Sequence, residues 1–236
     1  MAQSANIQTS SAPVNGHSPE AGTKVMKILV IGATRGSGQQ AALQALTAGH
    51  TVTALARDPA RVDIQHERLT VARGDVMDPD TLAPAMFGCD AVLSSLGVTS
   101  AYRKPTTLYS EGMRNVIQAM RAVGTRRLIA VTAAPVGRDK TDTLRNRILN
   151  KVLWTIIKEV YSDMARMEEV IRSSGLDWTI VRPPRLTNKP AIGRYRTALN
   201  GSVRGGYTVA RADLAGAMLK MLDDPAAIQA AIGIAY

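Results

Sequence analysis

Apolar residues fall in short runs that alternate with longer segments of helical spacing from residue 26 onward. Five of these runs predict buried strands, at 28–31, 51–56, 69–72, 91–93 and 127–132. Segments 37–48 and 106–123 have the spacing of amphipathic helices, and Asp78-Pro79 begins a shorter one. Strands that alternate with helices predict right-handed crossovers, and therefore an α/β fold built on a doubly wound parallel sheet.

The chain divides into an N-terminal extension and one domain. Residues 1–24 are rich in small and polar residues without periodicity, which predicts a mobile extension. Residues 25–236 form the expected domain, with a sixth strand at 177–182. Beyond it we expect a small portion that flanks a substrate pocket: a hairpin of 194–199 and 207–210, a helix at 211–222 and a strand at 232–236.

Segment 143–174 carries an apolar stripe at helical spacing together with several basic residues. This pattern predicts a helix that packs into the core with its charges in solvent. Two alternatives are a lid or partner surface over the pocket and a basic amphipathic contact with a membrane.

Three glycines follow the first strand at once and lead directly into the first helix. In such a turn the first glycine lets the backbone reverse, and the others allow a pyrophosphate or the strand to approach closely. The helix start offers unpaired N–H groups to an anion. The pattern therefore predicts a nucleotide-binding turn, with a plain strand-to-helix turn as the alternative; its candidate residues are Gly32, Thr34, Arg35, Gly36, Ser37 and Gly38.

Arg57 follows the second strand, about twenty residues beyond the glycines. An acidic residue at this place binds the 2′-hydroxyl of NAD, whereas a cation matches the 2′-phosphate of NADP. Asp58 stands one position later. With Arg35 and Arg61, Arg57 could form a guanidinium clamp, so the sequence favours NADP(H) over NAD.

Composition and charge narrow the class of ligand. The 236 residues are 45% hydrophobic and 20% charged, as in ordinary globular proteins, with a formal net charge of +10. The basic residues are spread through the fold, which favours a small anionic ligand over nucleic acid. No run approaches the ~18 apolar residues of a membrane span, and the N-terminus lacks the pattern of a secretory signal, so we expect a cytoplasmic protein. The single cysteine, Cys89, excludes an internal disulfide, and no metal-ligating constellation is present.

Several motifs occur in the order typical of a known family, among them GATRGSG, LARDPAR, RGDVMDPDTL, SSLG, LIAVTAA and GLDWTIVRPPRL. Over residues 26–236 the sequence resembles atypical short-chain dehydrogenases/reductases with a Rossmann fold. The resemblance is strongest to the NAD(P)H-binding group that contains biliverdin-IX-beta reductase and the NmrA-like proteins. It implies NADP(H), a monomer, and cofactor contacts from Thr34, Arg35, Arg57, Asp75, Val76, Leu96, Gly97, Thr132, Pro183 and Pro184.

The usual proton donors of that family are missing. The Tyr-x-x-x-Lys pair is absent, because Tyr161 is followed four places later by Ala165. Ala133 and Arg185 stand where the biliverdin reductase pattern has Ser and His. These departures put reduction of bilins in doubt.

Three residues remain candidates for chemistry. Arg185, expected in a loop after the sixth strand, could clamp an anionic substrate or polarise a carbonyl; a cofactor phosphate contact or a surface charge is its alternative. Tyr161 could donate a proton, or simply pack on its helix. Thr132, like Ser110, could cap an element or hold the cofactor.

The leading hypothesis is an NADPH-dependent reductase that transfers hydride to a small conjugated or carbonyl acceptor such as a flavin, quinone, enone or ketone. Such a transfer depends mainly on positioning, and a flavin or quinone can take its proton from water. One alternative is an NmrA-like sensor that binds NADP without turnover. Another is a non-redox isomerase or cyclase on the same fold.

Overall fold

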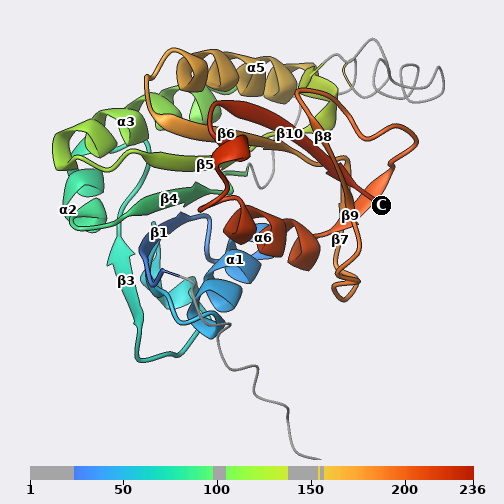
Figure 1. The fold of residues 1–236 in the computed structure, drawn as a ribbon. Coiled ribbons are helices and arrows are strands. Elements are labelled where there is room, and N and C mark those ends of the chain that lie inside the picture. Colours follow the sequence, from blue (N-terminus) through green and yellow to red (C-terminus); the bar gives the residue numbers. More distant parts are fainter. Residues whose placement is uncertain (1–23, 98–104, 138–153, 155–156) are drawn as a thin grey trace, which may run out of the picture.

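The computed structural model describes residues 24–97, 105–137, 154 and 157–236, shown in colour in Figure 1. Eight strands form one sheet in the order β3-β2-β1-β4-β5-β6-β10-β8. In sheet order these strands are Leu69–Arg73, Thr51–Ala56, Lys27–Ile31, Ala91–Ser94, Arg127–Val131, Asp177–Arg182, Ala230–Ala235 and Arg196–Leu199. All neighbours pair in parallel except β8, which is antiparallel to β10. The predicted doubly wound α/β sheet is therefore confirmed.

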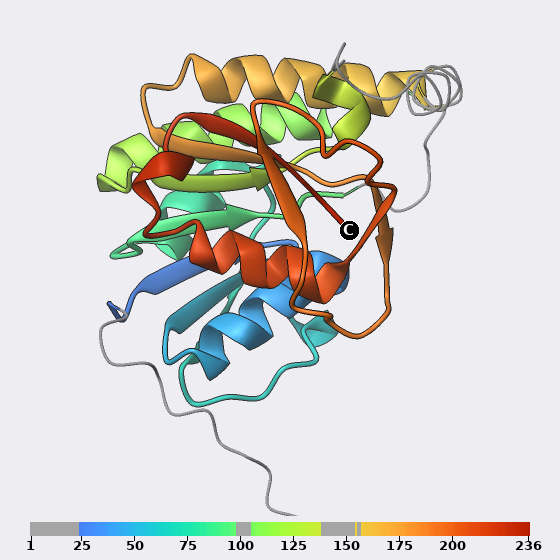
Figure 2. The ribbon, with the colours of Figure 1, turned by 45° about the vertical axis from the view of Figure 1, so that its right-hand side comes forward.

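Helices cover both faces of this sheet (Figures 1 and 2). One face carries α1 (Gly36–Thr47) and α6 (Arg211–Lys220), and the other carries α2 (Leu82–Met86), α3 (Leu108–Val123) and α5 (Lys158–Arg172). Alternate residues of β1 serve the two cores: Ile28 and Val30 pack with α1 and α6, while Leu29 and Ile31 pack with α2, α3 and α5. This division follows from the period of two along a strand and explains why β1 is apolar from Ile28 to Ile31.

The glycine turn between β1 and α1 requires its glycines. Gly32 has φ +87°, and a Cβ there would lie 2.4 Å from the carbonyl oxygen of Ser95. A Cβ on Gly38 would lie 2.3 Å from the carbonyl oxygen of Gly32. Gly38 thus lets α1 pack directly against the end of β1, as the sequence predicts for the last glycine of the motif.

We expect Gly38→Ala to lower the free energy of unfolding by about 2 kcal/mol, because the methyl group overlaps backbone that α1 and β1 hold in place. Gly216→Ala in α6 is the matched control. The atom nearest to a Cβ added at Gly216 would be Oε1 of Gln44, at 3.1 Å, and this side chain can move. Alanine also favours a helix more than glycine does, so we expect the free energy of unfolding to change by less than about 1 kcal/mol. Urea denaturation measures both; equal losses in the two variants would contradict this account of Gly38.

The predicted hairpin after the sixth strand is wrong. β8 pairs with β10 and extends the main sheet, whereas β9 (Thr208–Ala210) pairs in parallel with β7 (Arg185–Thr187). Asn200-Gly201 directly follows the first arm of the predicted hairpin, but Asn200 binds β10: its N–H donates to the carbonyl of Ala231 at 2.6 Å, and its Oδ1 accepts from the N–H of Ala231 at 3.1 Å. This Asn-Gly pair therefore ends the edge strand β8 and does not connect the two arms of a hairpin.

Two predicted segments lie partly or wholly outside the described residues. The extension over 1–24 is outside them except for Lys24. Of the helix predicted over 143–174, the described part is α5, together with Trp154, whose indole Nε1 donates to the carbonyl of Pro135 at 2.8 Å. The apolar stripe predicted before Lys158 falls mostly outside the described residues.

Candidate functional site

A cavity of about 360 Å³ lies at the carboxyl ends of the parallel strands. Its lining includes residues that follow β3, β2, β1 and β4, and it reaches Val131 and Thr132 at the end of β5. Ligands of doubly wound sheets bind at this edge. Many of the residues predicted for the cofactor line the cavity, namely Gly32, Thr34, Arg35, Gly36, Ser37, Arg57, Arg61, Asp75, Val76, Leu96, Gly97 and Thr132.

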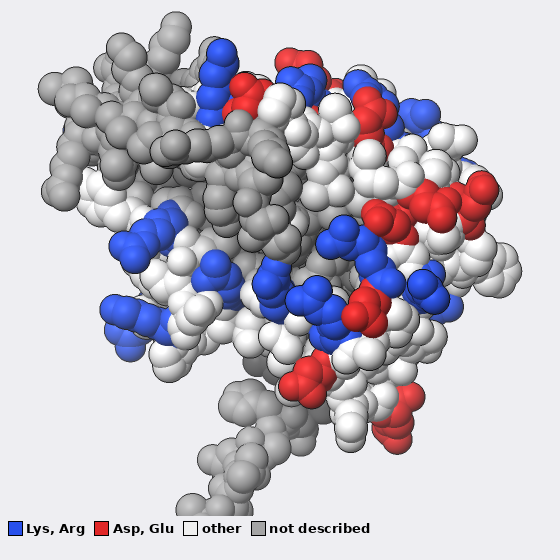
Figure 3. All heavy atoms as spheres, turned by 180° about the vertical axis from the view of Figure 1, so that it is seen from behind, with Lys and Arg blue, Asp and Glu red and all other residues white. Residues whose placement is uncertain are grey.

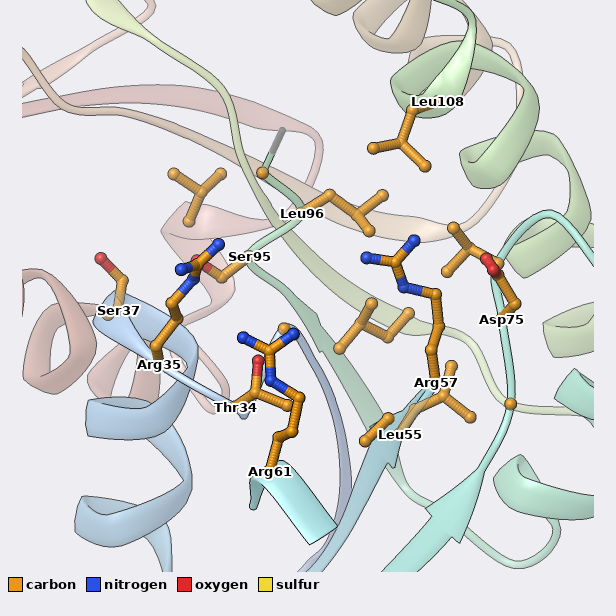
Figure 4. Close-up of a pocket in the computed structure, with 18 of the residues that line it drawn as sticks. Thr34, Arg35, Ser37, Leu55, Arg57, Arg61, Asp75, Ser95, Leu96 and Leu108 are labelled. Carbon is orange, nitrogen blue, oxygen red and sulfur yellow. The ribbon is translucent and has the colours of Figure 1, made fainter. Parts of the chain in front are cut away.

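Three arginines share one part of this cavity. Arg35 precedes α1, Arg57 follows β2, and Arg61 ends the short 3-10 turn Pro59–Arg61; Figure 4 shows their side chains extending into the same space. All three are exposed, and none takes part in an ion pair within the described part of the chain. This arrangement leaves their guanidinium groups available to a phosphate.

Asp58, the nearby carboxylate, has a local role. Its Oδ1 accepts a hydrogen bond from the N–H of Ala60 at 3.2 Å, which caps the 3-10 turn that carries Arg61. The carboxylate therefore helps to place an arginine and is one position away from the place where NAD-binding chains hold the ribose.

The start of α1 is suited to an anion. Its N-cap residue, Arg35, makes no side-chain capping bond, and the first turn holds no acidic residue. The hydroxyl of Ser37 is buried and has no hydrogen-bond partner among the residues that the structure describes. Gly36 has φ +65°, and a Cβ there would lie 3.5 Å from Nε of the Arg211 side chain. Free helix N–H groups, an unpartnered hydroxyl and an open backbone together fit a pyrophosphate group.

The three residues predicted for chemistry are not brought together. Thr132 lines the cavity, but Arg185 and Tyr161 are absent from the lining. Arg185 is an exposed residue at the start of β7. Tyr161 is buried on α5, where its ring centroid lies 5.6 Å from that of Trp154.

Burial raises the pKa of Tyr161 to about 12. The phenol therefore stays protonated at neutral pH, and its high pKa makes it a weak acid. Gly38 and the prolines Pro183 and Pro184, predicted to approach the cofactor, are likewise outside the cavity lining.

Sequence reasoning missed part of the lining. Leu55 and Val131 are strand-end residues, Met164 comes from α5, and Leu186 belongs to β7. Arg211, the first residue of α6, also lines the cavity and donates from Nη1 to Oδ1 of Asn188 at 2.7 Å. The positions of Met164, Leu186 and Arg211 depend on how α5, β7 and α6 return to the sheet edge, and no local motif indicates this.

Comparisons with known proteins identify the family of this chain. A model of the NAD(P)H-binding family matches residues 32–225, which begin at the first glycine of the turn. The chain belongs to this NAD(P)H-binding family. The curated relative called uncharacterized sugar epimerase YhfK, from Bacillus subtilis, is 26% identical over 209 residues, covering 84% of this chain and 89% of YhfK.

Solved structures share the fold of this chain. A short-chain dehydrogenase/reductase from Veillonella parvula, solved in complex with NADP, superposes with a TM-score of 0.75 at 21% identity; 90% of this chain and 95% of that chain are covered. ChuY, an anaerobilin reductase from Escherichia coli O157:H7, gives a TM-score of 0.71 at 22% identity, with 88% and 96% covered.

Membrane-spanning helices and metal-binding clusters are both absent from the described residues. None of their helices combines the length and the apolar character needed to cross a membrane. The same part of the chain contains no group of three or more His, Cys, Asp and Glu side chains placed to hold a metal ion.

Proposed function

We propose that this protein is an NADPH-dependent reductase that transfers hydride to a small conjugated or carbonyl acceptor, such as a flavin, quinone, enone or ketone. The observation that carries the proposal is the group formed by Arg35, Arg57 and Arg61, which have no ion-pair partner among the described residues and lie at the carboxyl ends of the strands. A 2′-phosphate is the feature that distinguishes NADPH from NADH, and these guanidinium groups are its natural partners.

The remaining residues of the cavity fit the rest of the cofactor. The free N–H groups of α1 and the hydroxyl of Ser37 would hold the pyrophosphate. Val131, Met164 and Leu186 would exclude water from the nicotinamide. When bound, the reduced nicotinamide supplies a hydride, and the chain's own contribution is to position the acceptor beside it.

The acidic residues of the described cavity lining are Asp58 and Asp75, which follow β2 and β3. Neither lies near the end of β5, where we place the nicotinamide. This distribution favours an acceptor that takes its proton from water, as flavins and quinones can. The basic surroundings suit anionic acceptors: Figure 3 shows a band of Lys and Arg side chains across one face of the molecule. In this proposal the protein acts as a cytoplasmic monomer on small molecules, without nucleic acid or membrane.

The test is a titration of the purified protein with NADPH and with NADH, followed by a panel of flavin, quinone and enone acceptors. We expect NADPH to bind at least about tenfold more tightly than NADH and to be oxidised when an acceptor is added. If neither nucleotide binds, the proposal fails. If NADPH binds but no acceptor oxidises it, the NmrA-like sensor replaces the reductase.

A non-redox reaction is the third outcome. The curated relative YhfK carries the words sugar epimerase in its name, whereas ChuY is named a reductase. Conversion of a substrate without net oxidation of NADPH would support an isomerase or cyclase and contradict the reductase.

A further inference from the structure

Thr132 lies where the cavity meets a buried polar cluster. It follows β5, is 4% exposed and lines the cavity. Its N–H donates to the carbonyl of Val181 at 2.9 Å, which extends the pairing of β5 with β6. The backbone that carries the Thr132 hydroxyl is therefore fixed.

The cluster behind this hydroxyl is built around Glu168 of α5, which is 5% exposed. Glu168 Oε1 accepts from the hydroxyl of Thr132 at 2.9 Å and from Nε of Arg182 at 2.9 Å. Its Oε2 accepts from Nη2 of Arg182 at 2.5 Å and lies 3.5 Å from Nη2 of Arg172. Two guanidinium groups thus hold the carboxylate in place against Thr132.

This arrangement fixes the direction of the hydrogen bond. An ionised carboxylate only accepts, so the Thr132 hydroxyl must donate its one hydrogen to Glu168. A ligand in the cavity then meets oxygen lone pairs, which can receive a hydrogen bond but cannot give one.

We propose that Glu168 is a positioning residue that makes Thr132 a hydrogen-bond acceptor for the carboxamide N–H₂ of the nicotinamide. The proposal rests on the proposed function, because it places the phosphate end of the cofactor at the arginines. Arg57 follows β2, and three strand spacings, about 14 Å, separate β2 from β5 in the sheet. An extended dinucleotide with its 2′-phosphate at Arg57 could span this distance, and its nicotinamide would then lie at Thr132.

The same geometry removes Thr132 from the list of proton donors. The acceptor gains a hydride from the cofactor, which is oxidised, and the proton that completes the reduction comes from water. The cavity is therefore suited to acceptors whose reduced form is stable as an anion before it is protonated, such as flavins and quinones.

The test compares binding of NADP⁺ with binding of its 3-acetylpyridine analogue, in which a methyl group replaces the carboxamide N–H₂. We expect the wild-type protein to bind NADP⁺ about fivefold more tightly than the analogue, the value of one neutral hydrogen bond. Thr132→Val should weaken NADP⁺ about fivefold and leave the analogue unchanged. Thr132→Ser, which keeps the hydroxyl, should retain the discrimination.

Glu168→Asp tests the positioning role, because it keeps a charge against Arg182 but withdraws the carboxylate from Thr132. We expect its discrimination between the two nucleotides to fall below about twofold and to stay there when Thr132→Val is added. Glu168→Gln is a second variant that tests the same role if Glu168→Asp does not fold. Thermal melting shows which variants are folded.

The outcomes separate the two proposals. Equal binding of both nucleotides by the wild type, or an equal loss of both in Thr132→Val, overturns the acceptor role while the reductase stands. Unchanged discrimination in folded Glu168 variants overturns the role of Glu168. If the wild-type protein binds neither nucleotide, the proposed function itself is contradicted.

Discussion

Arg57→Glu is expected to raise the Kd for NADPH about 100-fold and to change the Kd for NADH less than about threefold. Arg57 lines the cavity beside Arg35 and Arg61, is exposed and has no ion-pair partner within the described residues. The substitution removes a charge-assisted hydrogen bond to the 2′-phosphate and places a like charge beside it. NADH lacks that phosphate and so loses little. Fluorescence titration of the two nucleotides measures the change.

Arg204→Glu is the matched control for this experiment. It makes the same change in net charge at an exposed residue outside the cavity lining. We expect it to alter both dissociation constants less than about threefold at physiological salt, because salt screens an exposed charge that does not contact the nucleotide. Equal weakening of NADPH by the two variants would mean that the overall charge attracts the nucleotide and that Arg57 does not select the 2′-phosphate.

The main sheet and the glycine turn at its edge could be predicted because their signals are local. The strand at 51–56 and the strand at 177–182 were each bounded by turn residues, and the structure places them at those residues. The glycine turn was predictable for the same reason: Gly32 needs its φ of +87°, and Gly38 lies against the backbone of Gly32. Such requirements act on single residues and can be read from the sequence.

The C-terminal portion could not be predicted in this way, because strand partners are chosen over long separations. β8 and β9 look like the two arms of a hairpin, yet they pair with β10 and β7 respectively. The contact between Thr132 and Glu168 joins residues 36 positions apart on different elements. A glutamate on the buried face of α5 gives no local sign of a partner, and it is found only when α5 is packed on the sheet.

The side chain of Arg127 also binds residues that are distant in the sequence, and these hydrogen bonds stabilise the fold. It is the first residue of β5, only 8% exposed, and its guanidinium donates to main-chain carbonyls and a hydroxyl from two other parts of the chain. Nε donates to Leu222 at 3.0 Å, and Nη1 to Asp177 at 2.7 Å. Nη2 donates to Oγ1 of Thr179 at 2.8 Å and to the carbonyl of Met221. The side chain thereby joins β6 to the end of α6.

Burial lowers the pKa of Arg127, because removing the charged guanidinium from water costs free energy. The hydrogen bonds offset that cost, and their acceptors depend on Arg127 in turn. We expect Arg127→Leu to lower the free energy of unfolding by more than about 3 kcal/mol, because several buried acceptors lose their partner at once. Urea denaturation with a fixed slope measures this loss.

The neighbouring Arg126→Leu provides the control, because it removes the same charge from the adjacent position. The Arg126 side chain is 61% exposed and pairs with Asp177 at 3.2 Å, so its loss should change stability by less than about 1 kcal/mol. Arg127→Lys should fall between the two variants, since an ammonium keeps the charge but lacks the fork that reaches acceptors on both β6 and the end of α6. If Arg127→Lys were as stable as the wild type, charge would account for the effect and the hydrogen-bond geometry would not.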